Sequence, residues 1–114
     1  MSQAFSLIVF PVKDVEKAKA VYTKLLDSEP YMENPYYVGF RVGDQEIGLD
    51  PNGHKKGMTG PLGYYGVADI RKSVQSLVGA GARVTQDVKD VGGGRLTAWL
   101  ADVDDNPIGL LQLP

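Results

Sequence analysis

Two matched stretches decide the fold of this sequence: Val12-Lys13-Asp14-Val15-Glu16-Lys17 and its echo Val67-Ala68-Asp69-Ile70-Arg71-Lys72, 55 positions later. Each sets an aspartate directly before an apolar residue that begins an amphipathic stretch, a pattern typical of a helix N-terminus. A second pair, Ile47-Gly48-Leu49 and Ile108-Gly109-Leu110, follows in the same order at an offset of 61. Matched segments in a fixed order indicate two copies of one supersecondary unit, the second with a few extra loop residues.

Composition narrows the class of protein. The 114 residues fit one compact domain, and hydrophobic and charged residues make up 43% and 23% of the chain, as in ordinary globular proteins. The net charge of −2, with both signs interspersed, lacks the basic surface that nucleic-acid binding requires. Without cysteine there are no disulfides, thiolate nucleophiles or sulfur-ligated metals. Neither a basic N-terminal leader nor a spanning run of ~18 apolar residues is present, so we expect a cytoplasmic protein with no nucleic-acid or membrane partner.

Hydrophobic periodicity and turn residues predict the order of elements. In the first copy we expect a strand over 5–12, a helix capped by Asp14, a short irregular strand near Tyr31 and Met32, and strands over 36–42 and 45–50 joined by Gly43-Asp44. The second copy predicts a strand over 62–67, a helix capped by Asp69, and strands over 82–88, 95–101 and 107–113. The fold class is therefore α+β. Two βαβββ modules, 1–51 and 62–114, flank a linker over 52–61 in a single domain, and they form a curved eight-stranded mixed sheet with helices on its convex face.

Side-chain alternation predicts which residues the helices cover. We expect the first helix to turn Val15, Ala18, Val21, Tyr22 and Leu25 inward, and the second to turn Ile70, Val74 and Leu77 inward. The strand residues expected beneath the helices are Val38, Phe40, Ile47, Leu49, Leu96, Ala98, Leu100, Ile108 and Leu110. The residues expected on the opposite face, lining a concave cleft, are Tyr37, Arg41, Glu46, Gly48, Asp50, Thr97, Trp99, Gly109 and Leu111.

The doubled unit resembles the vicinal oxygen chelate superfamily, which includes glyoxalase I, extradiol dioxygenases, fosfomycin resistance enzymes and bleomycin resistance proteins. The V-x-D start of each helix and the late turn with Asp102, Asp104 and Asn106 carry the resemblance, which covers essentially the whole chain. It implies the βαβββ architecture, a ligand site on the concave face of the sheet, and a homodimer.

The resemblance also implies four metal-ligand positions, which in this sequence are Leu7, Gly48, Leu62 and Gly109. None of these side chains can ligate a metal, so we expect no metal and no cofactor. Two leucines and two glycines predict instead an apolar, roomy floor suited to a small organic ligand, aromatic or cationic in character. This is closest to the metal-free bleomycin-resistance branch, which binds without chemistry. The expected ligand contacts, none of them catalytic, are Leu7, Tyr37, Arg41, Glu46, Gly48, Asp50, Leu62, Tyr64, Trp99, Gly109 and Leu111.

Other interpretations of the same residues stay open. A metal-independent lyase or isomerase could use Arg41, Asp50 or Glu46, and a dimerisation module could fill its cleft with the partner chain. The aromatic residues Tyr37, Tyr64 and Trp99 fit either a cleft wall or a core. Likewise, Glu46 and Asp50 fit either solvated charge or contacts to a cationic ligand.

Three further motifs favour a structural interpretation. His54, the only histidine, stands beside Lys55 and Lys56 in a glycine-rich stretch, which predicts a solvated loop tip. The Asp102 turn begins like a calcium loop, but Pro107 stands where that loop requires glycine, which favours a hairpin turn. The run Gly92-Gly93-Gly94 leads into a strand rather than a helix, so it predicts a connection between strands and not a phosphate site.

Overall fold

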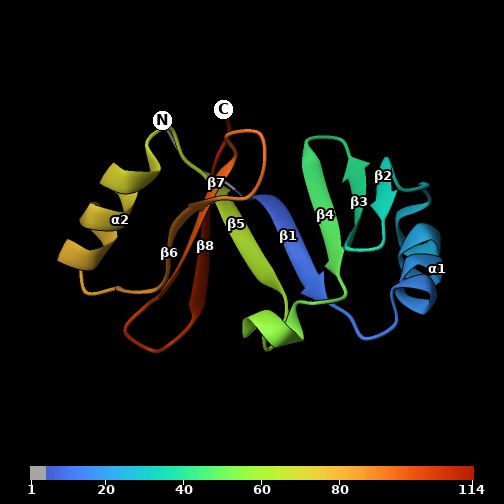
Figure 1. Ribbon diagram of the computed structural model, residues 1–114, viewed down its shortest axis with the longest axis horizontal. Helices are drawn as coiled ribbons and strands as arrows, with labels where there is room; N and C mark the ends of the chain where they lie inside the picture. The colour runs from blue at the N-terminus through green and yellow to red at the C-terminus, as the bar shows by residue number, and fades with distance from the viewer. Residues whose placement is uncertain (1–4) are drawn as a thin grey trace. The chain divides into compact units, whose positions relative to one another are not determined.

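The computed structural model describes residues 5–114. Within them the elements are β1 (Phe5–Pro11), α1 (Val15–Leu26), β2 (Met32–Asn34), β3 (Tyr37–Val42), β4 (Gln45–Asp50), a 3₁₀ helix (His54–Lys56), β5 (Leu62–Gly66), α2 (Ile70–Gly79), β6 (Arg83–Asp90), β7 (Leu96–Ala101) and β8 (Pro107–Gln112). The strands form an eight-stranded mixed sheet in the order β2-β3-β4-β1-β5-β8-β7-β6 (Figure 1). The predicted α+β class and its doubled βαβββ order are confirmed.

The described chain divides into two compact units. The N-terminal unit is Leu7–Leu62, and the C-terminal unit is Gly63–Pro114 together with the first two described residues, Phe5 and Ser6. Phe5 stacks on Tyr65 with ring centroids 4.4 Å apart. Phe5 and Ser6 thus pack with the second copy, although they belong to the first copy in the sequence. The two compact units therefore do not coincide with the two sequence repeats.

In the N-terminal unit, β1 runs parallel to β4, whereas β2, β3 and β4 are antiparallel neighbours. Gly43 opens the two-residue turn between β3 and β4 with φ of 59°, the left-handed conformation that glycine adopts at low cost. Helix α1 begins after Asp14, whose carboxylate accepts a hydrogen bond from the backbone N–H of Lys17 at 3.1 Å. The predicted cap is therefore confirmed.

The core of this unit lies between α1 and one face of its sheet. Val38, Phe40 and Leu49 are buried there, as predicted, and the residues packed against them are Phe10, Val12, Val15, Ala18, Tyr22, Leu26 and Ile47. The prediction for Val21 and Leu25 is wrong, because these side chains are 61% and 70% exposed. The side chains of α1 that pack on the sheet are Val15, Ala18, Tyr22 and Leu26. Val21 lies about 100° around the helix from Tyr22, at the edge of the predicted stripe that is turned away from the sheet.

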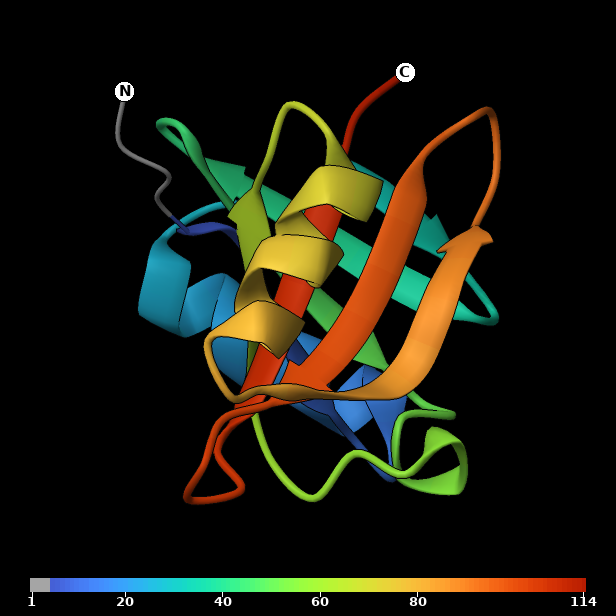
Figure 2. The same ribbon diagram turned by 90° about the vertical axis from the view of Figure 1, so that its left-hand side faces the viewer.

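The C-terminal unit repeats the plan: β5 is parallel to β8, and β8, β7 and β6 are antiparallel neighbours. Figure 2 looks onto this unit with α2 in front of β8 and β7. Asp69 caps α2 by accepting from the backbone N–H of Lys72 at 3.2 Å. The predicted core is confirmed: Ile70, Ala98, Leu100 and Leu110 are buried, and Val74, Leu77, Leu96 and Ile108 pack against them.

Two loops of the C-terminal unit confirm their structural interpretation. The carboxylate of Asp102 accepts hydrogen bonds from the backbone N–H groups of Asp104 and Asn106, at 2.8 and 2.9 Å, which closes the turn between β7 and β8. Hydrogen bonds from the side chain and backbone of Asn106 lower the pKa of Asp102 below its ordinary value of 3.8. The glycines at 92–94 all have positive φ and connect β6 to β7.

Within residues 5–114, neither helix has the length and apolar character needed to cross a membrane.

Candidate functional site

The sheet face opposite α1 carries the predicted contacts of the N-terminal unit. Leu7 pairs with Glu46 across β1 and β4, and Arg41 pairs with Glu46 across β3 and β4. Because Phe40 and Leu49 pack against α1, alternation places Tyr37, Arg41, Glu46, Gly48 and Asp50 on the other face. On that face Leu7, Gly48 and Asp50 are buried, Tyr37 and Glu46 are half-buried, and Arg41 is exposed.

The space above Gly48 is filled by a ring. A methyl group at position 48 would overlap the hydroxyl end of Tyr37, which reaches across from β3. In the C-terminal unit, a methyl group at Gly109 would lie 2.8 Å from Cδ1 of Tyr64, its partner on β5. The prediction of a roomy floor at these glycines is therefore wrong, because a tyrosine from the neighbouring strand takes the space that each missing side chain leaves.

A polar cluster occupies the outer part of the same N-terminal face. The guanidinium of Arg41 lies 4.2 Å from the centre of the Tyr31 ring, and its Nη2 is 3.6 Å from Oε1 of Glu46. Tyr31 donates a hydrogen bond to Glu46, and its ring packs over Gly39. Sequence reasoning missed Tyr31 as a member of this cluster, because Tyr31 lies before the short strand β2 and not in a strand. Side-chain alternation therefore gave no prediction of the face on which its ring lies.

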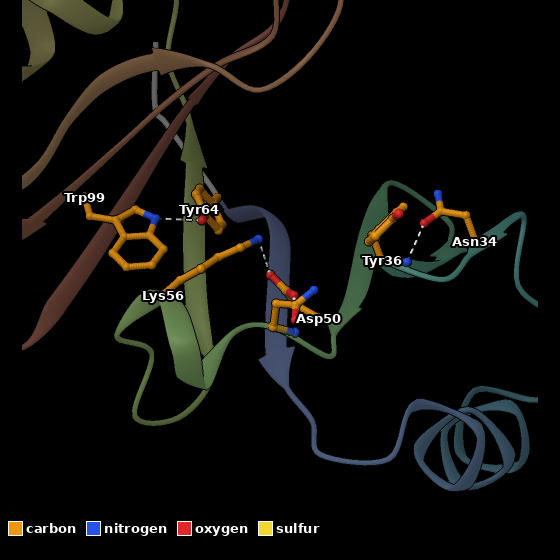
Figure 3. Close-up of polar contacts among 7 residues, drawn as sticks. Asn34, Tyr36, Asp50, Lys56, Tyr64 and Trp99 are labelled. Atoms are coloured by element: carbon orange, nitrogen blue, oxygen red, sulfur yellow. Dashed lines mark hydrogen bonds and ion pairs between the residues drawn. The ribbon is translucent and has the colours of Figure 1, made fainter.

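Asp50 is the connecting point for the segment that follows β4. Its carboxylate accepts a hydrogen bond from Nζ of Lys56 at 2.8 Å (Figure 3). It accepts another from the backbone N–H of Asn52, also at 2.8 Å. Its backbone carbonyl accepts two more, from the N–H groups of Val12 and Gly53. The interpretation of Asp50 as solvated charge is wrong, because its side chain is only 8% exposed and holds an ion pair.

The sheet face opposite α2 carries the predicted contacts of the C-terminal unit. Trp99 pairs with Gly109 and Thr97 pairs with Leu111, whereas Ala98 and Leu100 between them lie in the core under α2. Nε1 of Trp99 donates a hydrogen bond to Oη of Tyr64 at 2.7 Å (Figure 3). Trp99 is half-buried, while Tyr64 and Leu111 are buried. Trp99 is thus not part of the core under the helix.

The chemistry of these residues does not fit a catalytic metal. Leu7, Gly48, Leu62 and Gly109 carry no donor atoms in their side chains, and Leu62 is a buried residue that begins β5. In the part of the chain that the structure describes, no three His, Cys, Asp or Glu side chains converge into a possible ligand set. His54, the only histidine, is exposed on the 3₁₀ helix.

The duplicated βαβββ plan, with its parallel strand pair in each unit, defines a class of protein. The model of the Glyoxalase/Bleomycin resistance protein/Dioxygenase superfamily matches residues 4–110, and the chain belongs to this family. No curated protein matches the sequence.

Solved structures share the fold at low sequence identity. A hypothetical protein from Bacillus halodurans C-125 is 14% identical with a TM-score of 0.82, and the match covers 100% of this chain and 96% of that one. A structure described as the NAD-dependent benzaldehyde dehydrogenase from Legionella pneumophila is 18% identical with a TM-score of 0.77, covering 95% and 98%. Methylmalonyl-CoA epimerase from Mycobacterium tuberculosis is 14% identical with a TM-score of 0.75, covering 96% and 87%. Likeness at this level concerns the fold alone.

Proposed function

We propose that this protein binds or sequesters a small organic ligand, as the bleomycin-resistance branch of its family does, and that it uses no metal. One observation carries the proposal: the half-buried Trp99 stands on the sheet face opposite α2, hydrogen-bonded to Tyr64 at 2.7 Å. Gly109 and Leu111 extend this face without charge. A fixed indole beside buried apolar groups offers a large contact area for a planar ligand at low cost in entropy.

The metal-independent lyase or isomerase is the weaker alternative. It would need Arg41, Glu46 or Asp50 to exchange a proton with a substrate. Glu46 is instead bonded to Tyr31 and paired with Arg41, and Asp50 is bonded to Lys56 and Asn52. Carboxylates held by such partners are better suited to positioning a ligand than to acting as a general base.

The test uses Trp99, the only tryptophan, as its own reporter. Titration with a panel of aromatic amines, phenols and aromatic acids should reveal compounds that quench or shift its fluorescence. For those compounds, calorimetry should show that Trp99→Ala weakens binding by about 1–3 kcal/mol without unfolding the protein.

Tyr36→Ala is the matched control. Tyr36 is 73% exposed in the turn before β3, so its removal should leave affinity unchanged. Affinities that are equal in wild type and Trp99→Ala would refute the assignment, as would a panel in which no compound perturbs the Trp99 emission.

A further inference from the structure

The ion pair between Lys56 and Asp50 joins two very different environments. The side chain of Asp50 is 8% exposed, whereas that of Lys56 is 50% exposed. The carboxylate therefore belongs to the sheet, and the ammonium reaches it from the solvent side. A buried carboxylate is stable as a charge only with such a partner, because an unpaired buried charge is costly.

The neighbour of Asp50 on β1 is an apolar residue. Pro11 pairs with Asp50 across β1 and β4. A methyl group built on Gly53 would lie 2.7 Å from Cβ of Pro11 and 3.0 Å from Sδ of the buried Met58, so the linker packs closely here. A cation that replaced Lys56 would thus find one negative charge and, on the paired strand, the apolar ring of Pro11.

The segment that carries Lys56 is held at its start by Asp50 and beyond its end by the buried Met58. Lys56 ends the 3₁₀ helix His54–Lys56, which has a glycine on either side, and Gly57 adopts a φ of 100°. The N–H groups of Asn52 and Gly53 bond to the side chain and backbone of Asp50, so these anchors remain when Nζ of Lys56 leaves. The ammonium is therefore a separable part of the contact.

We propose that Asp50 is a binding point for primary ammonium groups on compounds with an apolar body, and that Lys56 is its internal occupant. This rests on the proposed binding function and names the chemical class of the ligand on the N-terminal unit. Oδ2 of Asp50 accepts the ligand's N–H, and Lys56 is displaced into solvent. Lys56 competes with the ligand from the same chain, at an effective concentration on the order of millimolar. An external amine must therefore exceed the competition from Lys56 in order to bind Asp50.

The experiment truncates the Lys56 side chain and supplies the missing part as a free amine in solution. Lys56→Ala deletes a propylammonium group, and n-propylammonium chloride is the probe. We expect Lys56→Ala to melt at a lower temperature than wild type and the probe to raise that temperature. The backbone amide signal of Asn52, which reports on Asp50 through its hydrogen bond, should shift at a probe concentration about tenfold lower than in wild type.

Three controls separate the site from general effects. Neutral n-propanol and sodium chloride at equal ionic strength should have no such effect. Lys55→Ala, which removes the exposed neighbouring lysine, should melt like wild type and respond to the probe only at the concentration that wild type requires. Addition of Asp50→Asn to Lys56→Ala should abolish the response.

The proposal is overturned if n-propylammonium acts on Lys56→Ala no more strongly than sodium chloride or n-propanol. If Lys56→Ala does not fold alone, refolding from denaturant with the probe replaces melting, and equal recovery with n-propanol is then the contrary result. The Trp99 titration measures ligand binding to the C-terminal unit, whereas Asp50 lies in the N-terminal unit. A failure at Asp50 therefore leaves the proposed function standing, and a failure at Trp99 leaves the amine result interpretable.

Discussion

Gly48 and Gly109 show how single residues determine what this fold can hold. Where the family resemblance places carboxylate ligands, each glycine lies under a tyrosine from the neighbouring strand, Tyr37 and Tyr64 respectively. Any side chain at these positions would compete with the ring for the same space. A donor side chain at position 48 and the present position of the Tyr37 ring therefore exclude each other, and placing a donor there requires Tyr37 to move.

Gly48→Ala should consequently destabilise the protein by about 1–3 kcal/mol, because the added methyl overlaps the Tyr37 hydroxyl. In a Tyr37→Ala background the same change should cost much less, which gives a coupling of about 0.5–3 kcal/mol in a double-mutant cycle measured by denaturant unfolding. Gly60→Ala is the control, since a methyl there meets nothing within 4 Å. A cycle in which the two changes are additive would contradict this account.

At the scale of elements, the sequence predicted most of what the structure contains. The order of elements along the chain followed from the repeat and the turn residues. The inward faces of the strands followed from alternation, because a strand residue has only two directions in which to point. The inward face of helix α1 was predicted less well: the predicted stripe included Val21 and Leu25, which are exposed, and left out Leu26, which packs on the sheet. The contacts that sequence reasoning missed depend on loops and rotamers: Tyr31 over Gly39, Tyr37 over Gly48, and Lys56 on Asp50.

The two helix N-caps should contribute equally to the free energy of unfolding, because Asp14 and Asp69 make the same hydrogen bond in the two copies. Asp14→Ala and Asp69→Ala should each lower the free energy of unfolding by about 0.5–2 kcal/mol, because each removes the acceptor for a backbone N–H in the first turn. Asp87→Ala, an exposed change within β6, should stay within about 0.5 kcal/mol of wild type. Denaturant titration of the three variants checks this, and caps no costlier than the control would be the contrary finding.

At the scale of the whole molecule, we propose a homodimer that does not form through the strand edges. The edge strand β2 has only three residues and lies between Pro30 and Pro35. The other edge strand, β6, carries register irregularities and alternating exposed residues that include Arg83, Asp87 and Lys89. Both are features by which sheets discourage edge pairing. We therefore expect the two-fold contact to form through a surface other than the strand edges.

Light scattering should give a mass of about twice the 12.3 kDa of one chain across micromolar to millimolar concentrations. Arg83→Ala and Lys89→Ala, which alter the β6 edge, should leave that mass unchanged. A particle that stays at the monomer mass would exclude the dimer, and a mass that changes with the β6 variants would place the contact at the edge.

Native mass spectrometry tests the central claim most directly, because one spectrum reports both metal and organic ligand. The protein is first incubated with Zn²⁺, Ni²⁺, Fe²⁺ or Mn²⁺ and desalted, and then offered the compounds that perturb Trp99. The account predicts no retained metal, since Leu7, Gly48, Leu62 and Gly109 provide no donors, and a stoichiometric mass increment from the organic compound. A metal ion retained at one per chain, with no organic compound bound, would contradict it.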